Sequence, residues 1–234
     1  MNGEIEVSVS KVKLKKKIIK IAKITILALV LFLFALYLVM GIIYNNGNFS
    51  ITLDKNLYFD NGIIIYDDED YKVYRSELYA ASVNYFDNIS HKWLPNNLDE
   101  GKGSHNGDNY IAYTFFIENT GEEITDYWSE ILIDDVIKNV DEAIRVRVYK
   151  NGEYVTYAKM SSNGKPEKDT IPFVSDELVV REHAENFKPG DVNKYTIVIW
   201  LEGGDIDCTD NILGGKIKMH MEFNSEFIEE PEKE

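Results

Sequence analysis

The chain has 234 residues and a formal net charge of −15 at pH 7. Residues 1–44 hold seven lysines and two acidic residues, so the remainder carries 18 basic against 38 acidic residues, or −20. A domain this acidic repels a phosphate backbone, which argues against nucleic-acid binding. Acidic surfaces usually serve solubility, and they also attract cations or basic partners.

Cys208 is the only cysteine, so no disulfide can form within the chain. If the acidic part lies outside the cell, its stability must come from a buried hydrophobic core. Residues 45–223 are numerous enough to form such a core.

Residues 24–44, ITILALVLFLFALYLVMGIIY, contain no charge. A helix of this length spans about 30 Å, the hydrocarbon thickness of a bilayer. The run is longer than the apolar part of a cleaved secretory signal and lacks a small-x-small cleavage site after it. A retained signal anchor is therefore favoured over cleavage, which stays the alternative.

The lysines that precede this run predict the orientation. No lysine follows the run until Lys55, and such a bias keeps the N-terminus in the cytoplasm. Residues 1–23 are then a basic cytoplasmic segment in contact with anionic lipid. Both the anchor and the cleaved signal place residues 45–223 outside the cell.

Beyond the apolar run the hydrophobic pattern changes to a period of two, which is typical of strands. In 216–223, Ile217, Met219, Met221 and Phe223 are expected to point inward. Asn151-Gly152 predicts a hairpin turn, because a type I′ turn needs positive φ at both central positions. The predicted strands are 49–53, 62–66, 110–119, 126–133, 143–150, 153–159, 177–182, 193–202 and 216–223.

Alternating strands with one polar face predict an antiparallel β-sandwich of jelly-roll type over residues 45–223. A short helix is expected at 134–143, which begins with acidic residues. Residues 86–109 and 161–172 are expected to be long surface loops. Residues 224–234 form an acidic tail.

The stretch 200–215, WLEGGDIDCTDNILGG, is the strongest candidate for a site. Asp205, Asp207 and Thr209 alternate as in an EF-hand, but that loop needs glycine at its sixth position and glutamate at its twelfth. The chain has Asp210 and Lys216 there, so an EF-hand is excluded. A plain structured turn is the favoured interpretation, with a looser Ca²⁺ site from Asp205, Asp207 and Asp210 as the alternative. No other cofactor is predicted.

Several blocks of the chain resemble bacterial surface proteins near the TasA/camelysin group. They are FSITL, DNYIAYTFFIENTG, VDEAIRVRVYKNG and YTIVIWLEGGDIDCTDNILGGKIKMHMEF, after a lysine-led hydrophobic N-terminus. The resemblance implies a jelly-roll domain with a matrix or fibre-subunit role. It also implies the metalloprotease activity attributed to camelysin, but the chain has no metal-binding motif onto which that activity could be carried.

Three functions fit these features. The first is a membrane-tethered β-sandwich with a structural or interaction role toward envelope or matrix proteins, in an oligomeric state that the sequence leaves open. The second is a hydrolase built on His91, His105 and Asp108 in the long loop. The third is a Ca²⁺- or carbohydrate-binding module that uses exposed aromatic residues such as Trp93 and Trp128.

Overall fold

The computed structural model describes residues 2–44, 48–83 and 87–225, with the side chains of the first helix described from Leu14 to Val39. The chain divides into two compact units, Met1–Asn46 and Gly47–Glu234. The second unit is called the β domain below. Most of the predicted acidic tail, from residue 226 on, lies outside the described residues.

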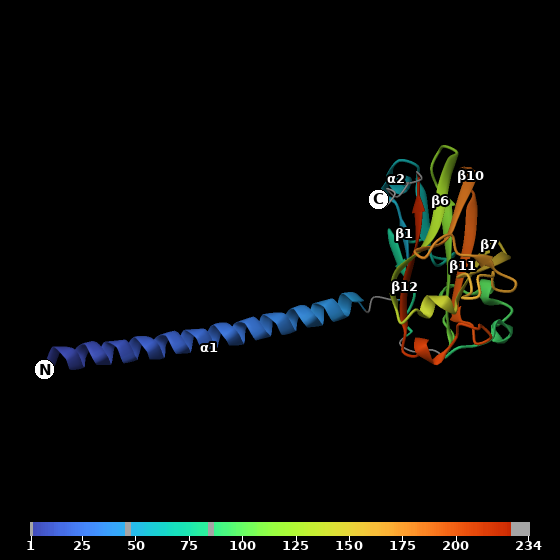
Figure 1. Ribbon diagram of the computed structural model, residues 1–234. Coiled ribbons are helices and arrows are strands. Elements are labelled where there is room, and N and C mark those ends of the chain that lie inside the picture. The colour runs from blue at the N-terminus through green and yellow to red at the C-terminus, as the bar shows by residue number, and fades with distance from the viewer. Residues whose placement is uncertain (1, 45–47, 84–86, 226–234) are drawn as a thin grey trace, which may run out of the picture. The chain divides into compact units, whose positions relative to one another are not determined.

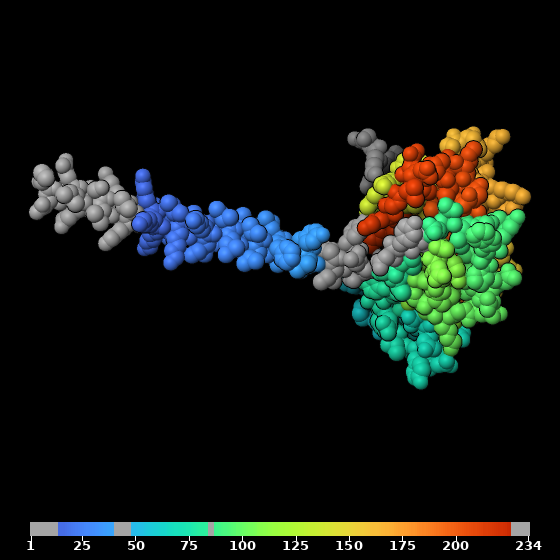
Figure 2. All heavy atoms as spheres, turned by 90° about the horizontal axis from the view of Figure 1, so that it is seen from below, coloured from blue at the N-terminus to red at the C-terminus, as the bar shows by residue number. Residues whose placement is uncertain are grey.

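The first unit is one helix, α1 (Asn2–Tyr44), which contains the uncharged run 24–44. Its segment Leu14–Val39 is long and apolar enough to cross a membrane, and none of it is buried. Figure 2 draws the side chains of this segment in blue. The hydroxyl of Thr25 donates a 3.0 Å hydrogen bond to the carbonyl of Ile21, so this polar group is satisfied within the helix.

The described part of the β domain has twelve strands in two sheets (Figure 1). The five-stranded sheet contains, in spatial order, β10 (Leu178–Phe187), β6 (Thr125–Ile137), β12 (Lys216–Asn224), β1 (Phe49–Leu53) and β3 (Glu77–Tyr79). The seven-stranded sheet contains, in order, β2 (Ile63–Tyr66), β5 (Tyr110–Asn119), β11 (Val192–Leu201), β7 (Ile144–Lys150), β8 (Glu153–Ala158) and β9 (Ile171–Pro172), with β4 (Gly103–Ser104) also paired to β5.

Short helices connect some of these strands. The α-helix α2 (Lys55–Phe59) follows β1, and Asp54 caps it by accepting a hydrogen bond from the backbone N–H of Asn56. The others are 3₁₀ helices: η1 (His91–Trp93), η2 (Leu98–Glu100), η3 (Val140–Glu142) and η4 (Asp210–Ile212).

The sheets are mixed, which corrects the expectation of purely antiparallel pairing. β1 runs parallel to β12, with Phe49 opposite Met219 and Leu53 opposite Phe223, and β8 runs parallel to β9. The remaining pairs between the strands are antiparallel. Parallel neighbours need a long connection, and here almost the whole domain separates β1 from β12.

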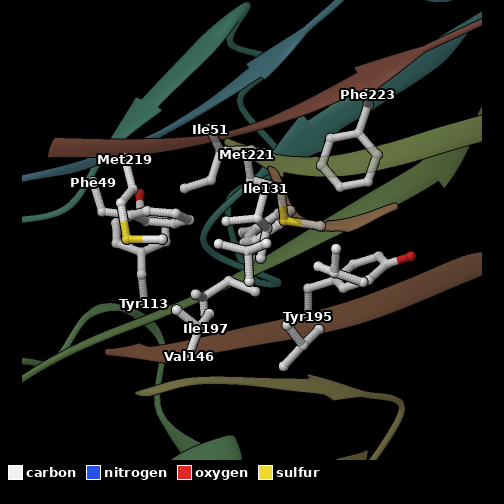
Figure 3. Packing of buried hydrophobic residues seen from close by; sticks show 14 of the residues in the cluster. Phe49, Ile51, Tyr113, Ile131, Val146, Tyr195, Ile197, Met219, Met221 and Phe223 are labelled. Atoms are coloured by element: carbon white, nitrogen blue, oxygen red, sulfur yellow. The ribbon is translucent and has the colours of Figure 1, made fainter. Parts of the chain in front are cut away.

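One hydrophobic cluster fills the space between the two sheets. Figure 3 shows side chains of the five-stranded sheet, such as Phe49 and Met221, facing Ile197 and Val146 of the seven-stranded sheet. Two buried tyrosines, Tyr127 and Tyr195, join the sheets through a 3.1 Å hydrogen bond between their hydroxyls. Phe223 packs edge-on against both rings, so a satisfied polar contact lies inside the core.

Most predicted strands are present. In β12, Ile217, Met219, Met221 and Phe223 are buried, as the alternation predicts. The hairpin turn is also confirmed, since Asn151 has φ 54° and Gly152 has φ 90°.

The predicted helix at 134–143 is wrong. Residues up to Ile137 extend β6, where Asp135 pairs with Lys218 of β12, and only the 3₁₀ turn η3 follows. Cross-strand pairing with an oppositely charged neighbour outweighs the weak local preference for a helix.

The loop that the sequence predicts at the surface packs onto the outer face of the seven-stranded sheet. Its Ile89, Leu94 and Leu98 form a second buried cluster with sheet residues Ala112, Tyr149, Val198 and Trp200. This sheet is therefore buried on both faces at its centre, and the prediction of one polar face per strand is wrong for β7. Tyr149 and Arg145, which alternate with the apolar Ile144, Val146 and Val148 along this strand, are 6% and 4% exposed.

Candidate functional site

The acidic stretch 200–215 forms part of an ion-pair cluster on the covered side of the seven-stranded sheet. The cluster consists of Arg145, Glu167, Asp205 and Asp207 and is called the acidic loop cluster below. Arg145 comes from β7, Glu167 from the loop between β8 and β9, and the two aspartates from the turn after β11. Three segments far apart in the sequence thus meet here.

Arg145 supplies the positive charge of this cluster. Its Nη2 lies 2.6 Å from Oδ2 of Asp205 and 3.1 Å from Oε2 of Glu167. The side chains of Arg145 and Asp205 are 5% and 0% exposed, so water screens their attraction little. Within the described residues, Oδ2 of Asp205 accepts no well-directed hydrogen bond. The nearby charge of Arg145 is therefore what offsets the cost of burying this carboxylate.

Asp207 is held by the opposite loop. Its Oδ2 accepts hydrogen bonds from the Ser161 hydroxyl at 3.2 Å and from the backbone N–H of Ser162 at 2.9 Å. Hydrogen bonds from Ser162, then from Ser161, lower the pKa of Asp207, and the charge of Arg145 adds to this. The backbone N–H of Asp207 donates to Oδ1 of Asp205 at 2.8 Å, so the two aspartates are also fixed to each other.

The cluster has the composition of a cation site, with one change from the predicted residues. Carboxylate oxygens of Glu167, Asp205 and Asp207 all lie within 4.8 Å of one another. Asp210 is exposed at the start of η4 and does not belong to this group. Three carboxylates and one guanidinium leave a formal charge of −2, and carboxylate oxygens are ligands that Ca²⁺ prefers.

Cys208 lies beside this cluster and is partly buried. Burial raises the pKa of its thiol, and the carboxylates of Asp205 and Glu202 raise it further. A thiol in such surroundings stays protonated and is a poor nucleophile. The structure thus gives Cys208 the surroundings of a packing residue.

Glu202 ties the covering loop to the acidic stretch. Its Oε2 accepts hydrogen bonds from Trp200 Nε1 at 3.0 Å and from the backbone N–H of His91 at 2.9 Å. Burial alone would raise the pKa of Glu202, but hydrogen bonds from Trp200, His91 and Gly204 outweigh it and lower the pKa. The ionised carboxylate of Glu202 thus connects η1 to the end of β11 through hydrogen bonds.

Of the three residues suggested for a hydrolase, the two histidines have structural partners. Both ring nitrogens of His105 lie 2.9 Å from carbonyl oxygens, those of Gly103 and Leu98. Nδ1 of His91 faces Glu202 at 3.5 Å, and Asp108 is exposed in the turn before β5. A general base must be free to reach the proton it takes, and His105 is engaged on both sides.

A second group of charges crosses the open face of the five-stranded sheet. Arg181 of β10 pairs with Glu130 of β6, and Glu130 lies opposite Glu222 of β12. His220 then contacts Glu222, with Nε2 3.6 Å from Oε2, and Asp134, with Nδ1 2.7 Å from Oδ1. This row is called the charge ladder below.

The two glutamates of the charge ladder differ in their surroundings. Burial raises the pKa of Glu130, in spite of Arg181, and the neighbouring Glu222 contributes to the rise. A hydrogen bond with His220 lowers the pKa of Glu222. Two interacting carboxyl groups titrate as a pair, and here Glu222 ionises before Glu130 as pH rises.

The aromatic residues suggested for ligand contact lie on different surfaces. Trp93 in η1 is 74% exposed. Trp128 lies on the open face of the five-stranded sheet and stacks on His183, with ring centroids 4.2 Å apart. Trp93 thus belongs to the loop that covers the seven-stranded sheet, and Trp128 to the outer face of the five-stranded sheet, so the two do not form one surface.

The sequence missed Arg145 and Glu167 as parts of the cluster. Arg145 reads as an outward residue of a strand, and Glu167 stands in a loop about 40 positions before Asp205. Only the packing of two loops brings them together, and no spacing in the sequence encodes it.

No protein-family model matches the chain, and no characterised protein matches its sequence significantly. Two solved structures of a β-glucosidase from Kluyveromyces marxianus align with 68% of the chain, at 12% and 11% identity and TM-scores of 0.24 and 0.23. The alignments cover 15% and 16% of those enzymes, and similarity at this level indicates neither fold nor function.

Proposed function

We propose that the chain is a single-pass membrane protein that displays its β domain outside the cell, where it has a structural or interaction role. The observation that carries the proposal is the exposed apolar surface of α1. Between residues 24 and 39, twelve large aliphatic or phenylalanine side chains are 44–62% exposed. A helix that is apolar on every side belongs in a core or a membrane.

The free energy involved is large. Removing such a side chain from water is worth about 1.5–3 kcal/mol, so twelve of them, each about half covered by its own helix, amount to roughly 10–20 kcal/mol. The β domain has a hydrophobic core of its own. A bilayer supplies the missing apolar surroundings for α1.

The charges on either side of the span support the orientation. Lys15, Lys16, Lys17, Lys20 and Lys23 precede the apolar run, whereas the β domain is strongly acidic. Positive residues stay on the cytoplasmic side. We therefore propose a cytoplasmic N-terminus and an external β domain, with retention of the anchor preferred over cleavage.

Features of the β domain favour contact over catalysis. Its covering loop is fixed by the buried Ile89, Leu94 and Leu98 and by the hydrogen bond from the His91 backbone to Glu202. The five-stranded sheet, in contrast, presents a charged and partly exposed outer face. The jelly-roll arrangement, the relation to the TasA/camelysin group and contact with envelope or matrix proteins belong to the same proposal. The sequence blocks quoted above support them.

Cell fractionation tests the proposal. The full chain is expected in the membrane fraction after a carbonate wash, and protease added to intact cells is expected to cleave the β domain. Leu29→Lys with Leu33→Lys should release the chain from the membrane, because each lysine at the centre of a span costs about 3 kcal/mol. The mature N-terminus, read from the same material, distinguishes an anchored protein from a secreted one.

A matched control adds the same two charges to the β domain. Ile124→Lys with Leu213→Lys changes side chains that are 58% and 59% exposed, close to the 58% and 55% of Leu29 and Leu33. This variant should stay in the membrane fraction. Intact chain in the soluble cytosolic fraction, protected from external protease, would refute the proposal. A purified chain that stays monomeric and binds no envelope component would refute the interaction role.

A second candidate function is Ca²⁺-dependent binding, and the acidic loop cluster supports it. Glu167, Asp205 and Asp207 leave an excess of negative charge around Arg145, and two loops would be joined by a cation there. At a Ca²⁺ concentration about 100 times Kd, the folded domain would gain about 2.7 kcal/mol.

Calorimetry and thermal unfolding of the full chain test this candidate. Ca²⁺ should raise the Tm of the unaltered chain, and Glu167→Gln or Asp207→Asn should remove the rise. Asp210→Asn takes one charge from the same loop but outside the cluster, so it should keep the rise. If Ca²⁺ gives no heat and no shift, or if Asp210→Asn behaves like Asp207→Asn, the cluster is not a Ca²⁺ site.

A further inference from the structure

The basic segment before the apolar run is a continuation of the same helix. α1 has 43 residues, which at 1.5 Å per residue gives a length of about 65 Å. A bilayer needs only about 20 residues to span its hydrocarbon. If residues 24–44 fill that thickness, the N-terminal half of α1 extends beyond it as a helix.

The lysines of this extension lie mainly on one face. Lys16, Lys17, Lys20 and Lys23 are spaced i, i+1, i+4 and i+7, which on a helix of 3.6 residues per turn confines them to an arc of about 120°. The four lysines are called the basic face below. On the other side of the helix lie Leu14, Ile18 and Ile21, which are 61%, 57% and 54% exposed.

The basic face has no acidic neighbour along the helix. The sequence contains no aspartate or glutamate between Glu6 and Asp54, so i, i+4 ion pairs are unavailable to these lysines. Their side chains are exposed. Four adjacent positive charges therefore stand unneutralised where the chain would leave the hydrocarbon.

We propose that the basic face binds the phosphate groups of anionic lipids in the leaflet through which α1 enters the membrane. This inference rests on the proposed membrane insertion. Transmembrane helices tilt by about 20° on average, which brings one face of the extension toward the headgroups. Lysine stems can lie along the apolar boundary while their ammonium groups reach the phosphates. Clusters of four to eight basic residues beside a span bind anionic lipid in this way.

The test uses the full chain reconstituted in vesicles of phosphatidylcholine with about 30% phosphatidylglycerol. Spin-labelled forms of either lipid report which one is enriched next to the protein. The unaltered chain should prefer phosphatidylglycerol several-fold at low salt, with the preference falling toward one at 0.5 M salt, where the screening length is about 4 Å. Both leaflets have the same composition, so orientation does not affect the result.

Three variants separate the basic face from general charge. K16Q/K17Q/K20Q/K23Q should lose the preference, and K16R/K17R/K20R/K23R should keep it. The matched control neutralises four exposed lysines of the β domain, K55Q/K165Q/K168Q/K188Q, and should also keep it.

The outcomes are distinct. An inserted chain with equal affinity for both lipids, or a glutamine variant that keeps the preference, overturns this inference alone. Binding of an acidic protein to the basic face, without a preference for anionic lipid, would likewise overturn this inference alone. A chain that a carbonate wash removes from the vesicles refutes membrane insertion itself.

Discussion

The two sheets of the β domain share one core but differ on their outer faces. The seven-stranded sheet is covered by the loop that carries Ile89 and Leu98, and polar groups such as Arg145 are buried beneath other segments. The charge ladder of the five-stranded sheet is only partly covered: the side chains of His220 and Glu222 are 23% and 30% exposed, although Glu130 is buried. The difference shows that a polar side chain on a strand does not by itself indicate a solvent-exposed face. A loop can cover the face and supply the opposite charge, as at Arg145.

The largest expected effect compares two tryptophans. Trp200, 1% exposed, lies on the covered face, and Trp128 lies on the open face. Trp200→Ala should cost about 4 kcal/mol of the free energy of unfolding, through lost packing and a lost hydrogen bond to Glu202. Trp128→Ala should cost about 1 kcal/mol. Chemical denaturation followed by circular dichroism measures both, and equal losses would contradict the distinction between the faces.

Arg145→Met is expected to cost about 3 kcal/mol, because the fully buried Asp205 loses its partner. Asp205→Asn added to Arg145→Met should recover part of this loss, since the uncompensated charge disappears. Denaturation of the single and double variants gives the coupling. If the two losses simply add, the ion pair does not stabilise the covered face.

Gly152→Ala is expected to cost about 1 kcal/mol and changes an exposed turn of the same covered sheet. The cause is backbone strain at φ 90°, since an added Cβ would meet no atom within 4 Å. If Gly152→Ala lost as much stability as Trp200→Ala, burial under the covering loop would not be what determines the loss of unfolding free energy. Asn151→Gly is the control, because glycine tolerates the φ of 54° found there.

The smallest effect concerns pH on the open face. A hydrogen bond with Glu222, then the charge of Asp134, raises the pKa of His220 above its ordinary 6.5, although burial opposes this. The group thus contributes stability that is complete below pH 6.5 and is lost as pH rises through the folded-state pKa. His220→Gln should flatten the decline of stability above pH 6.5. An unchanged slope in denaturation measured across that range would contradict the role of His220.

The sequence predicts those features of the fold that are determined within a single strand or turn. The alternation in β12 predicts its buried face, and Asn151-Gly152 predicts the hairpin, because side-chain period and turn geometry are local properties. The cover over β7 was not predictable, since it depends on a loop rich in turn residues that folds back onto the sheet. For the same reason the pattern at 205–210 suggested Asp210, whereas packing between loops selects Glu167.

The parallel pair β1–β12 has a mechanical consequence. The chain enters the domain at the start of β1 and continues from the far end of β12, as Figure 1 shows by their directions. Tension applied between Phe49 and Asn224 would pull these neighbours past each other. The backbone hydrogen bonds along Phe49–Leu53 would then be loaded simultaneously in shear, and would not break one after another.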